Sequence, residues 1–530
     1  MKFFLSCAIC LLIAGCVSDK SVQNFDVDAF EQELVELQTS FHIPGLAVLV
    51  KQGERTVYEN YLGYADLDSR VPLDSSTLIP IASVSKTFAS VLIFQLIEEG
   101  KLSLDTPINA FLDASQLSDS IKVKHVLSQT SQGEIGKHFL YSNRFSLLTR
   151  AIETAGGMSI EEQFERRIIT PLALGHTVPF TGDSLVSKYT FAKPYTFYGS
   201  TEPGRYDPGV SAASGLASTV RDLARFDNAL NNNVLISEES KTTLTKAFGS
   251  TNLYGYGVFV QQFLGEKMIW SYGQNDCFSS LFLKIPGKDL TLILLANNNL
   301  MSDPPRLING DITYSLFALN FLKHFVYDLP EVLTFSEYKR EGLENVDRVS
   351  AAYQDQQVGA FYRQELLGHA IANGYLGQAD PTLTDQSFRL LRKAFEYYPD
   401  YTSYGNSTLL QNLMVLSLSS EIEELGDVYE KLGQELLEDW EQDPYVNTYL
   451  GMYYSKLGAV SDALPHFHMV ADSDGFSPFW YTLEAWNYLA TYYKDEKPSV
   501  AKAYYQRIID TGWNYAGYLE NARATISTMH

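Results

Sequence analysis

The sequence predicts an α+β protein, in which an antiparallel sheet is flanked by helices and followed by an α-helical repeat domain. Two observations predict this arrangement. Strand-like runs stand near both ends of the first 330 residues with helical patterns between them, whereas the last 200 residues are helical and rich in tyrosine and leucine. A chain of 530 residues is also too long for one hydrophobic core, so two or three domains are expected.

The sheet is expected from runs at the two ends of the first region. Residues 46–66 contain two strand-like runs around Gly53, which predict a hairpin, and residues 25–43 before them have the spacing of an amphipathic helix. Residues 82–100 predict a helix that ends at Gly100. Three successive strands are expected in residues 258–273, 278–287 and 290–298, with turns at Gly265, Asn275 and Pro286-Gly287.

Helical repeats are expected in the last 200 residues. Residues 449–467 have the residue spacing of a tetratricopeptide repeat, residues 488–508 resemble a looser copy, and residues 388–401 resemble the end of another. A non-repetitive helical bundle is the alternative. We expect the paired tyrosines to form the core between helices and not a ligand platform, because each helix pair must bury one face against its neighbour. The tyrosines concerned are Tyr453, Tyr454, Tyr492, Tyr493, Tyr504 and Tyr505.

The charge of the chain argues against a nucleic-acid partner. The formal net charge is −23, which opposes binding through phosphates. Residues 331–530 carry 29 acidic and 14 basic side chains, or −15, so the first 330 residues carry −23 + 15 = −8. The acidic region predicts a solvated face or a protein partner that is basic.

The first residues resemble the signal of a bacterial lipoprotein. Lys2 precedes an apolar run over residues 3–15, which is too short to span a bilayer as a mature helix. The run ends in Ile13-Ala14-Gly15-Cys16, which resembles a lipobox and implies cleavage before Cys16 and lipidation of its thiol. A plain secretory signal is the alternative. We expect an envelope protein anchored by Cys16, in the outer membrane and facing the periplasm.

The cysteines predict neither a disulfide nor a metal site. Cys7 and Cys10 lie in the segment expected to be removed, and Cys16 is expected to be acylated, which leaves Cys277 alone. The sequence also lacks H-E-x-x-H, G-x-x-x-x-G-K-[ST], G-x-G-x-x-G and G-x-S-x-G motifs. We therefore expect no metal and no cofactor.

The stretch "IASVSKTF" places Ser83 and Lys86 three residues apart at the start of a helix. Side chains at this spacing lie on one face, where an amine can accept the hydroxyl proton as the serine attacks a carbonyl. The alternative is structural, because Ser83 or Ser85 could cap the first free amides of the helix. Of the two serines, Ser83 is the expected nucleophile and Ser85 the expected structural residue.

The residues around this stretch resemble the class C β-lactamase-like serine hydrolases. The resemblance begins in "IPGLAVLVKQGERTVYENYLGYADLDSRVPLDSSTLIPIASVSKTF" and continues, in the order typical of that family, through residues 121–131, 139–177 and 209–230. It covers roughly residues 27–300. The domains expected are a signal peptide at 1–15, a serine hydrolase domain at 16–330 and an acidic, tetratricopeptide-like domain at 331–530.

The resemblance implies the roles of four residues. Ser83 corresponds to the acylated nucleophile and Lys86 to its base. Tyr141-Ser142-Asn143 corresponds to the Tyr-x-Asn motif of the family, in which Tyr141 carries a proton to the leaving group and Asn143 holds the substrate amide and Lys86. A buried lysine beside a tyrosine can share a proton because each group shifts the pKa of the other.

The third motif of the family is altered in this chain. Ser271-Tyr272-Gly273 stands where the family has Lys-Thr-Gly or His-x-Gly. The amide of Gln274 remains available to form an oxyanion hole with that of Ser83. The missing cation predicts weaker recognition of a substrate carboxylate, so we expect cephalosporins to be poor substrates and Ser271→Lys or Ser271→His to improve their turnover. Lys124 or Lys137 could supply the missing charge.

A second departure lies before Tyr141. The usual His-Thr-Ser-Gly phrase is Gln129-Thr130-Ser131-Gln132 here, and only a few residues separate it from Tyr141. A short loop leaves that side of the cleft open or lets another element close it, and the helical domain is one candidate for this role.

Two functions are weighed. The first is an envelope-anchored serine hydrolase that cleaves an ester or amide through an acyl-enzyme, as an esterase, a D-amino-acid peptidase or a β-lactamase-related enzyme acting on a small-molecule or peptide substrate. The second is an impaired hydrolase that binds a protein partner through its repeats. Serine-dependent labelling by a fluorescent penicillin or a fluorophosphonate, compared with Ser83→Ala, distinguishes the two functions.

Overall fold

The computed structural model describes residues 25–529 apart from 113–116, 198, 207–208, 250–252, 330–342, 354–356, 378–379, 398–412, 414–425, 474–478 and 514. The predictions for Cys7, Cys10 and Cys16 therefore concern residues outside the described part. The expected domain boundary at residue 331 also lies outside it.

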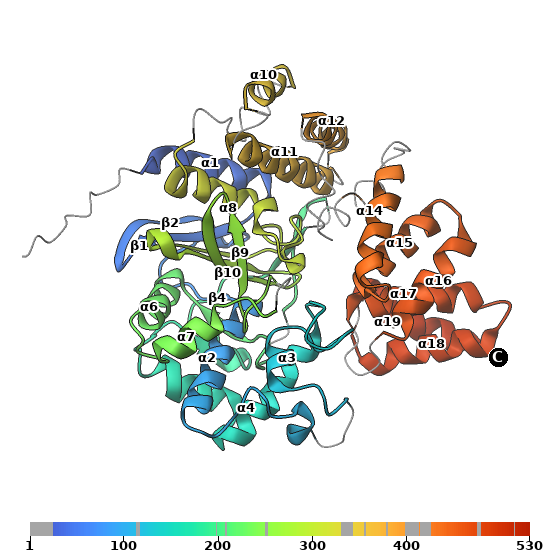
Figure 1. The fold of residues 1–530 in the computed structure, drawn as a ribbon, viewed down its shortest axis with the longest axis horizontal. Helices are drawn as coiled ribbons and strands as arrows, with labels where there is room; N and C mark the ends of the chain where they lie inside the picture. Colours follow the sequence, from blue (N-terminus) through green and yellow to red (C-terminus); the bar gives the residue numbers. More distant parts are fainter. Residues whose placement is uncertain are drawn as a thin grey trace, which may run out of the picture.

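A seven-stranded antiparallel sheet forms the centre of the first domain within the described residues (Figure 1). Its strands, in spatial order, are β3 Val71–Pro72, β2 Arg55–Asp66, β1 Gly45–Gln52, β12 Leu290–Ala296, β11 Ser279–Ile285, β10 Glu266–Gln274 and β9 Phe259–Phe263. The strands from the two ends of the domain meet where β1 pairs with β12. The expected α+β fold with an antiparallel sheet is confirmed.

Helices cover both faces of this sheet, which explains why its central strands are apolar along their whole length. In β1, Leu46 and Val48 join the hydrophobic core under α1 (Val27–Ser40) and α8 (Leu316–Phe321), while Ala47 and Leu49 join the core around α2 (Ser85–Glu98). Successive side chains of a strand point to opposite faces. Every residue of β12 is buried for the same reason.

The expected hairpin is present, and the first of the three expected strand runs is divided. The run over residues 258–273 forms two strands, β9 and β10, because Leu264 and Gly265 both adopt positive φ and form a tight turn. Two successive residues with positive φ give the turn whose twist matches an antiparallel hairpin. The turn at Gly265 was expected, but it divides the first run into two strands, so the region contains four strands and not three.

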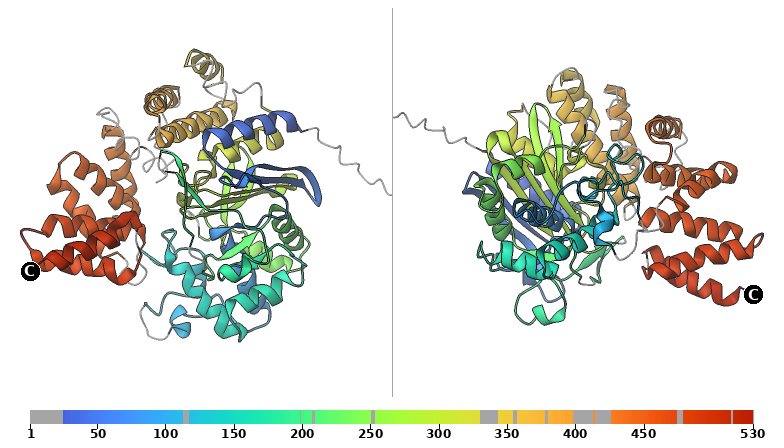
Figure 2. Two further views of the ribbon diagram at one scale, coloured as in Figure 1. Left: turned by 180° about the vertical axis from the view of Figure 1, so that it is seen from behind. Right: turned by 60° about the horizontal axis from the view of Figure 1, so that its bottom comes forward.

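The remaining α-helices and strands of the first domain within the described residues lie between β3 and β9 in the sequence. They are α3 Val123–Leu127, α4 Leu148–Gly156, α5 Ile160–Phe164, α6 Val220–Asn231 and α7 Glu238–Leu244. A three-stranded sheet comprises β4 Ile79–Pro80, β8 Leu216–Ser218 and β5 Val178–Pro179, and a two-stranded one comprises β6 Tyr195–Phe197 and β7 Thr201–Pro203. Most of these helices lie on the face of the large sheet opposite α1 and α8 (Figures 1 and 2).

The last part of the described chain is helical. Its helices are α10 Leu343–Tyr353, α11 Gln357–Leu376, α12 Pro381–Tyr397, α14 Gly426–Asp439, α15 Pro444–Lys456, α16 Val460–Ala471, α17 Trp480–Tyr493, α18 Pro498–Thr511 and α19 Tyr518–Thr528. Helices α15 to α19 pack against one another in chain order, and they lie beside the first domain (Figure 2). We refer to α10–α19 as the helical domain. Its kinship to tetratricopeptide repeats stays a prediction.

The tyrosines of the helical domain divide between core and surface. Tyr453 and Tyr505 are buried in its hydrophobic core, and Tyr454, Tyr493 and Tyr504 pack against that core from partly buried positions. Tyr492 is exposed. The described residues contain no helix that is both long and apolar enough to cross a membrane.

Candidate active site

Ser83 lies in a short 3-10 helix, η1 (Ala82–Val84), which leads directly into α2. Ile81, the residue before η1, is held from two sides, because its amide donates to Leu216 O at 2.9 Å and Ser280 Oγ donates to its carbonyl oxygen at 2.8 Å. Ala82 adopts φ +43°, an unfavourable conformation for an L-residue with a side chain. Strain of this kind often accompanies functional sites. The side chain of Ser83 is half-buried.

Lys86 is 4% exposed and lies against Ser83. Its Nζ donates to Ser83 Oγ at 2.9 Å and to the carbonyl of Ala213 at 3.1 Å. It makes no ion pair with any carboxylate in the described part of the chain. Burial without a counter-ion lowers the pKa of the Lys86 amine to about 7, so a large fraction of it is neutral at physiological pH.

Tyr141 is buried on the other side of Lys86. The Nζ of Lys86 lies 4.8 Å from the centre of the Tyr141 ring and 5.5 Å from that of Phe145. Burial raises the pKa of Tyr141 above its usual value, and a hydrogen bond with Ser83 opposes part of that rise. Burial also raises the pKa values of Tyr254 and Tyr272, which lie against Tyr141. These phenols are therefore protonated at neutral pH.

The two serines of the "IASVSKTF" stretch have different environments. Neither η1 nor α2 has a side-chain hydrogen bond at its N-cap, so capping does not account for Ser83. Ser85 is fully buried, and its Oγ accepts from the amide of Leu216 at 3.2 Å. This bond ties α2 to β8, which is a structural contact.

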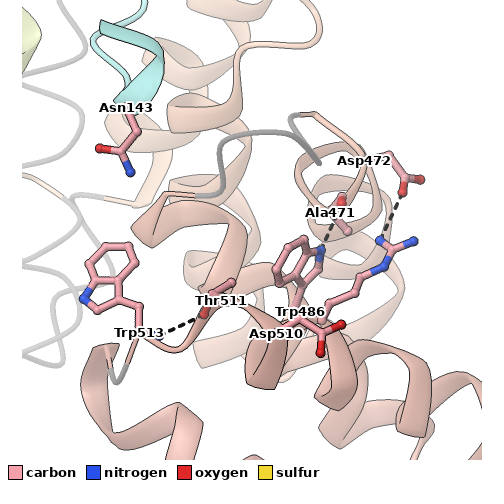
Figure 3. A pocket seen from close by; sticks show the side chains of 8 residues that line it. Asn143, Ala471, Asp472, Trp486, Asp510, Thr511 and Trp513 are labelled. Carbon is pink, nitrogen blue, oxygen red and sulfur yellow. Dashed lines mark hydrogen bonds and ion pairs between the residues drawn. The ribbon is translucent and has the colours of Figure 1, made fainter. Parts of the chain in front are cut away.

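Asn143 has a more exposed environment than Lys86. It begins the 3-10 helix η3 (Asn143–Leu147), its side chain is exposed, and the hydrogen bonds of Lys86 go to Ser83 and Ala213. Asn143 lines a cleft of about 860 Å³, in which the helical domain forms the opposite wall (Figure 3). The residues of that wall are Ala471, Asp472, Trp486, Arg507, Asp510, Thr511 and Trp513.

The third motif lies on β10, directly against η1. A Cβ atom on Gly273 would lie 2.1 Å from Ile81 O and 2.3 Å from Ser280 Oγ, so only glycine allows β10 to approach this closely. Strand β9 pairs with β10 only from Glu266 to Trp270, and the edge beyond Trp270 faces η1. The side chain of Ser271 is buried, and its Oγ has no hydrogen-bond partner among the described residues.

A charged cluster adjoins this wall, and the sequence reasoning missed it. Asp303 accepts from Gln274 Nε2 at 2.7 Å, from Arg306 Nη1 at 2.6 Å and from the Tyr375 hydroxyl at 2.5 Å. A cation therefore lies near the third motif, but Asp303 balances its charge. Asp276 lies on the same side, where burial and Asp303 raise the pKa of its carboxyl. The one signal for this cluster in the sequence was the apolar strand that precedes Asp303, because that strand was expected to end beside β1.

The two lysines proposed as replacements for the missing cation are engaged on the surface. Lys124 forms an ion pair with Asp105 at 2.8 Å, and Lys137 forms one with Glu134 at 3.5 Å. Neither is shown to contact the third motif. Cys277 is buried, its Sγ lies 3.2 Å from Arg205 O, and burial raises the pKa of its thiol to about 12. The described residues hold no cluster of three or more side chains suited to a metal ion.

The short segment before Tyr141 contacts the helical domain. Gln129 holds it from the first domain, because its carbonyl accepts from the amide of Leu140 at 2.8 Å and its Oε1 accepts from the amide of Ser142 at 3.1 Å. From the other side, the Tyr445 hydroxyl donates to Tyr141 O at 2.9 Å. Sequence reasoning named the helical domain as a candidate to close this side, but it did not identify Tyr445.

The arrangement as a whole suits acyl transfer. It joins a half-buried hydroxyl, an amine whose pKa burial lowers to about 7, a protonated phenol and a strand edge that can supply amides. Ser83, Lys86 and Tyr141 lie together, and Ser271, Tyr272, Gly273 and Gln274 lie on the facing wall.

Comparison with known proteins gives results that agree with one another. Residues 27–310 match the family model described as Beta-lactamase. The chain is 23% identical to penicillin-binding protein 4* of Bacillus subtilis over 392 residues, which is 63% of this chain and 83% of that protein. It is 24% identical to protein flp of Staphylococcus aureus over 304 residues, 49% of this chain and 60% of flp. The octameric penicillin-binding protein homologue from Pyrococcus abyssi has the same fold, with a TM-score of 0.50 at 24% identity over 56% of this chain and 77% of that one.

Proposed function

Because this chain belongs to the beta-lactamase family, we propose that it is a serine hydrolase that cleaves an ester or amide through an acyl-enzyme on Ser83. One observation carries the proposal. Lys86 is buried 2.9 Å from the Ser83 hydroxyl without a carboxylate partner in the described residues, and the pKa of its amine falls to about 7. A structural lysine gains nothing from such a site, whereas a base for a serine hydroxyl requires it.

The reaction follows from the positions of these groups. Neutral Lys86 takes the proton from Ser83 Oγ as the oxygen attacks the carbonyl carbon, and the oxyanion is held by the amides of Ser83 and Gln274. Tyr141 donates its proton to the leaving alcohol or amine as the carbon–oxygen or carbon–nitrogen bond breaks, and it recovers a proton from Lys86. Water then attacks the acyl-enzyme with the same groups in reverse, releasing the acid and restoring Ser83.

The charges near the third motif favour neutral or cationic substrates. Ser271 supplies no charge, Arg306 is paired with Asp303, and Asp276 adds a further acidic group. This wall therefore offers no net positive charge to a substrate carboxylate. We expect short-chain nitrophenyl esters to be cleaved and cephalosporins to be poor substrates. Efficient, Ser83-dependent hydrolysis of nitrocefin would contradict this choice of substrate.

The test of the hydrolase is covalent labelling followed by peptide mapping. Wild-type protein treated with a fluorophosphonate should gain one adduct on the peptide that contains Ser83, and it should hydrolyse nitrophenyl butyrate. Ser83→Ala should show neither the adduct nor the hydrolysis of nitrophenyl butyrate. Ser85→Ala is the matched control and should keep the label, because the hydroxyl of Ser85 accepts from the amide of Leu216, a structural contact. Absence of a Ser83 adduct together with absence of ester turnover would favour the alternative, a binding protein that acts through its helical domain.

We also propose that Cys16 anchors the protein in the cell envelope, in the outer membrane and facing the periplasm. The support is the Lys2 start, the short apolar run and the Ile13-Ala14-Gly15-Cys16 phrase. The test is metabolic labelling with a radioactive fatty acid followed by membrane fractionation. Label on wild-type protein, and its loss in Cys16→Ala with release from the membrane fraction, is the expected result. An unlabelled, soluble wild-type protein would exclude the anchor.

A further inference from the structure

We propose that the helical domain is part of the active site, and that Tyr445 is a positioning residue that fixes Tyr141 through the main chain. The inference rests on the proposed function, in which Tyr141 protonates the leaving group. Tyr445 contacts no reacting atom. It acts on the peptide that carries Tyr141.

The contact itself is buried and direct. The Tyr445 hydroxyl donates to the carbonyl oxygen of Tyr141 at 2.9 Å, and both residues are buried. The bond joins residues 304 positions apart and links α15 with the segment that leads into η3. A buried carbonyl that loses its donor retains the cost of its lost hydration, so the peptide would move to recover a partner.

Tyr445 is itself held in place. It lies in the first turn of α15, where the side chain of Asp443 accepts from the amides of Tyr445 and Val446 at 2.8 and 3.1 Å. Its ring contacts those of Tyr481 at 5.1 Å and Trp480 at 5.7 Å between centroids. A donor fixed by a capped helix and by two aromatic rings can define the position of the peptide that it binds.

The helical domain also contacts the residues just before Tyr141. The Trp440 ring stacks on His138, with centroids 4.7 Å apart and planes at 15°. Gly133 passes so close that a Cβ atom there would lie 2.8 Å from Trp440, and its φ is +64°. Leu140 is buried in the hydrophobic core of the helical domain, whereas Tyr141 is buried in that of the sheet. The chain thus passes from one core to the other at the residue expected to transfer the proton.

Position matters here because proton transfer requires heavy atoms within about 2.6–3.2 Å of each other. The Tyr141 ring has one face toward Lys86 and its hydroxyl near Ser83. A rotation of its peptide would move the hydroxyl relative to both groups while leaving the Ser83–Lys86 pair intact. Among the described residues, the main-chain hydrogen bonds by which the first domain holds this segment come from Gln129.

The experiment compares Tyr445→Phe with Tyr429→Phe in the full-length protein. Tyr445→Phe removes only the hydroxyl. The control removes the buried hydroxyl of Tyr429 in α14, which has no hydrogen-bond partner among the described residues. Each variant is assayed with a nitrophenyl ester, whose leaving group needs little protonation, and with an alkyl ester of the same acid, whose leaving group needs a proton.

We expect kcat/KM of Tyr445→Phe to fall about tenfold for the alkyl ester, the equivalent of one lost hydrogen bond. For the nitrophenyl ester the fall should be less than about twofold, and Tyr429→Phe should match wild type on both esters. Replacement of Tyr445 by 4-aminophenylalanine, which retains a donor, should restore the alkyl-ester activity. This variant keeps the proposal testable if the phenylalanine variant folds poorly.

Two outcomes would overturn the inference. One is an equal loss on both esters together with a lower melting temperature, which is the signature of a merely structural contact. The other is wild-type activity on both esters. Failure of the proposed function appears separately, because in that case Ser83→Ala would not abolish hydrolysis of either ester by the otherwise unmodified protein.

Discussion

Lys86 and Lys323 are both buried lysines in this protein, and their surroundings shift the pKa values of their amines in opposite directions. Lys323, whose side chain is 7% exposed, lies 3.1 Å from Glu33 Oε1 and 2.5 Å from Glu365 Oε1, and these carboxylates raise its pKa despite the opposing effect of burial. Lys86 has no such partner in the described residues, so burial alone lowers its pKa to about 7.

The difference shows how one residue type performs two tasks in the same protein. Burial disfavours the ammonium form in both cases, and only the presence of carboxylates decides the direction of the shift. Lys323 joins α1 to α11 and so ties the sheet domain to the helical domain. Lys86 faces a serine, two aromatic rings and a carbonyl, which leave its lone pair available for proton transfer.

The largest effect is expected for Lys86→Met. Removal of the base should lower kcat/KM for nitrophenyl butyrate by about 10²–10⁴-fold, the usual contribution of acid–base catalysis. Because the lysine is desolvated without a counter-ion, the melting temperature should not fall. Steady-state kinetics and a thermal melt check both expectations, and a fully active variant would show that Lys86 is not the base.

Lys323→Met should give the opposite pattern. It removes the ammonium group that contacts the buried Glu33 and Glu365, although Glu33 keeps His324 Nε2 at 3.1 Å, and removal of one partner from a buried pair costs about 3–5 kcal/mol. The free energy of unfolding, measured by denaturant titration, should fall by this amount while kcat of the folded protein stays close to wild type. Unchanged stability would contradict the assignment of Lys323 as a tether. Adding Glu33→Gln and Glu365→Gln should recover part of the loss.

Tyr141→Phe tests the neighbour that most distinguishes the surroundings of Lys86 from those of Lys323. Loss of the phenolic proton should lower kcat/KM for an alkyl ester by about 10²-fold and for the corresponding nitrophenyl ester by much less, because a good leaving group departs without protonation. A series of esters with leaving groups of graded acidity provides the measurement. An equal loss across the series would assign Tyr141 a packing role.

The smallest effect is expected for Trp513→Ala, on the helical side of the cleft. Trp513 is 38% exposed and faces Asn143 across the cleft (Figure 3). Removal of an aromatic contact of about 0.5–1.5 kcal/mol should raise KM about 2–10-fold for a peptide ester long enough to reach it. KM for nitrophenyl acetate should not change. Equal KM values for wild type and variant on both substrates would place the substrate elsewhere.

The sequence was sufficient for the fold and for the contact between Ser83 and Lys86, because both are recorded in local patterns. The apolar runs of β1 and β12, the glycine turns and the Ser83-x-x-Lys86 spacing each indicate their structure within a few residues. The close approach of β10 to Ile81 gives a physical reason for the glycine at position 273.

The outer part could not be predicted, because it depends on contacts between distant segments. Nothing near Tyr445 in the sequence indicates that its hydroxyl meets Tyr141, 304 residues away. The same holds for Asp303, which gathers Gln274 from β10 and Tyr375 from α11. Asn143 was expected to hold the substrate amide and Lys86, and nothing in its sequence surroundings indicated that its exposed side chain lines a cleft with the helical domain.

The central claim, that Lys86 acts as a neutral base for Ser83, is tested most directly by the pH dependence of Ser83 labelling by a fluorophosphonate. Because the pKa of Lys86 is lowered to about 7, the rate constant should rise tenfold per pH unit below that value and level off above it, where the amine has lost its proton. The raised pKa of Tyr141 predicts no decline up to about pH 9.

Asp443→Asn serves as the control for this titration, because burial raises the pKa of Asp443 to about 6 and its carboxyl caps the helix that carries Tyr445. The midpoint near pH 7 should persist in this variant. A rate that is independent of pH from 5 to 9, or one that rises only near pH 10, would contradict the account.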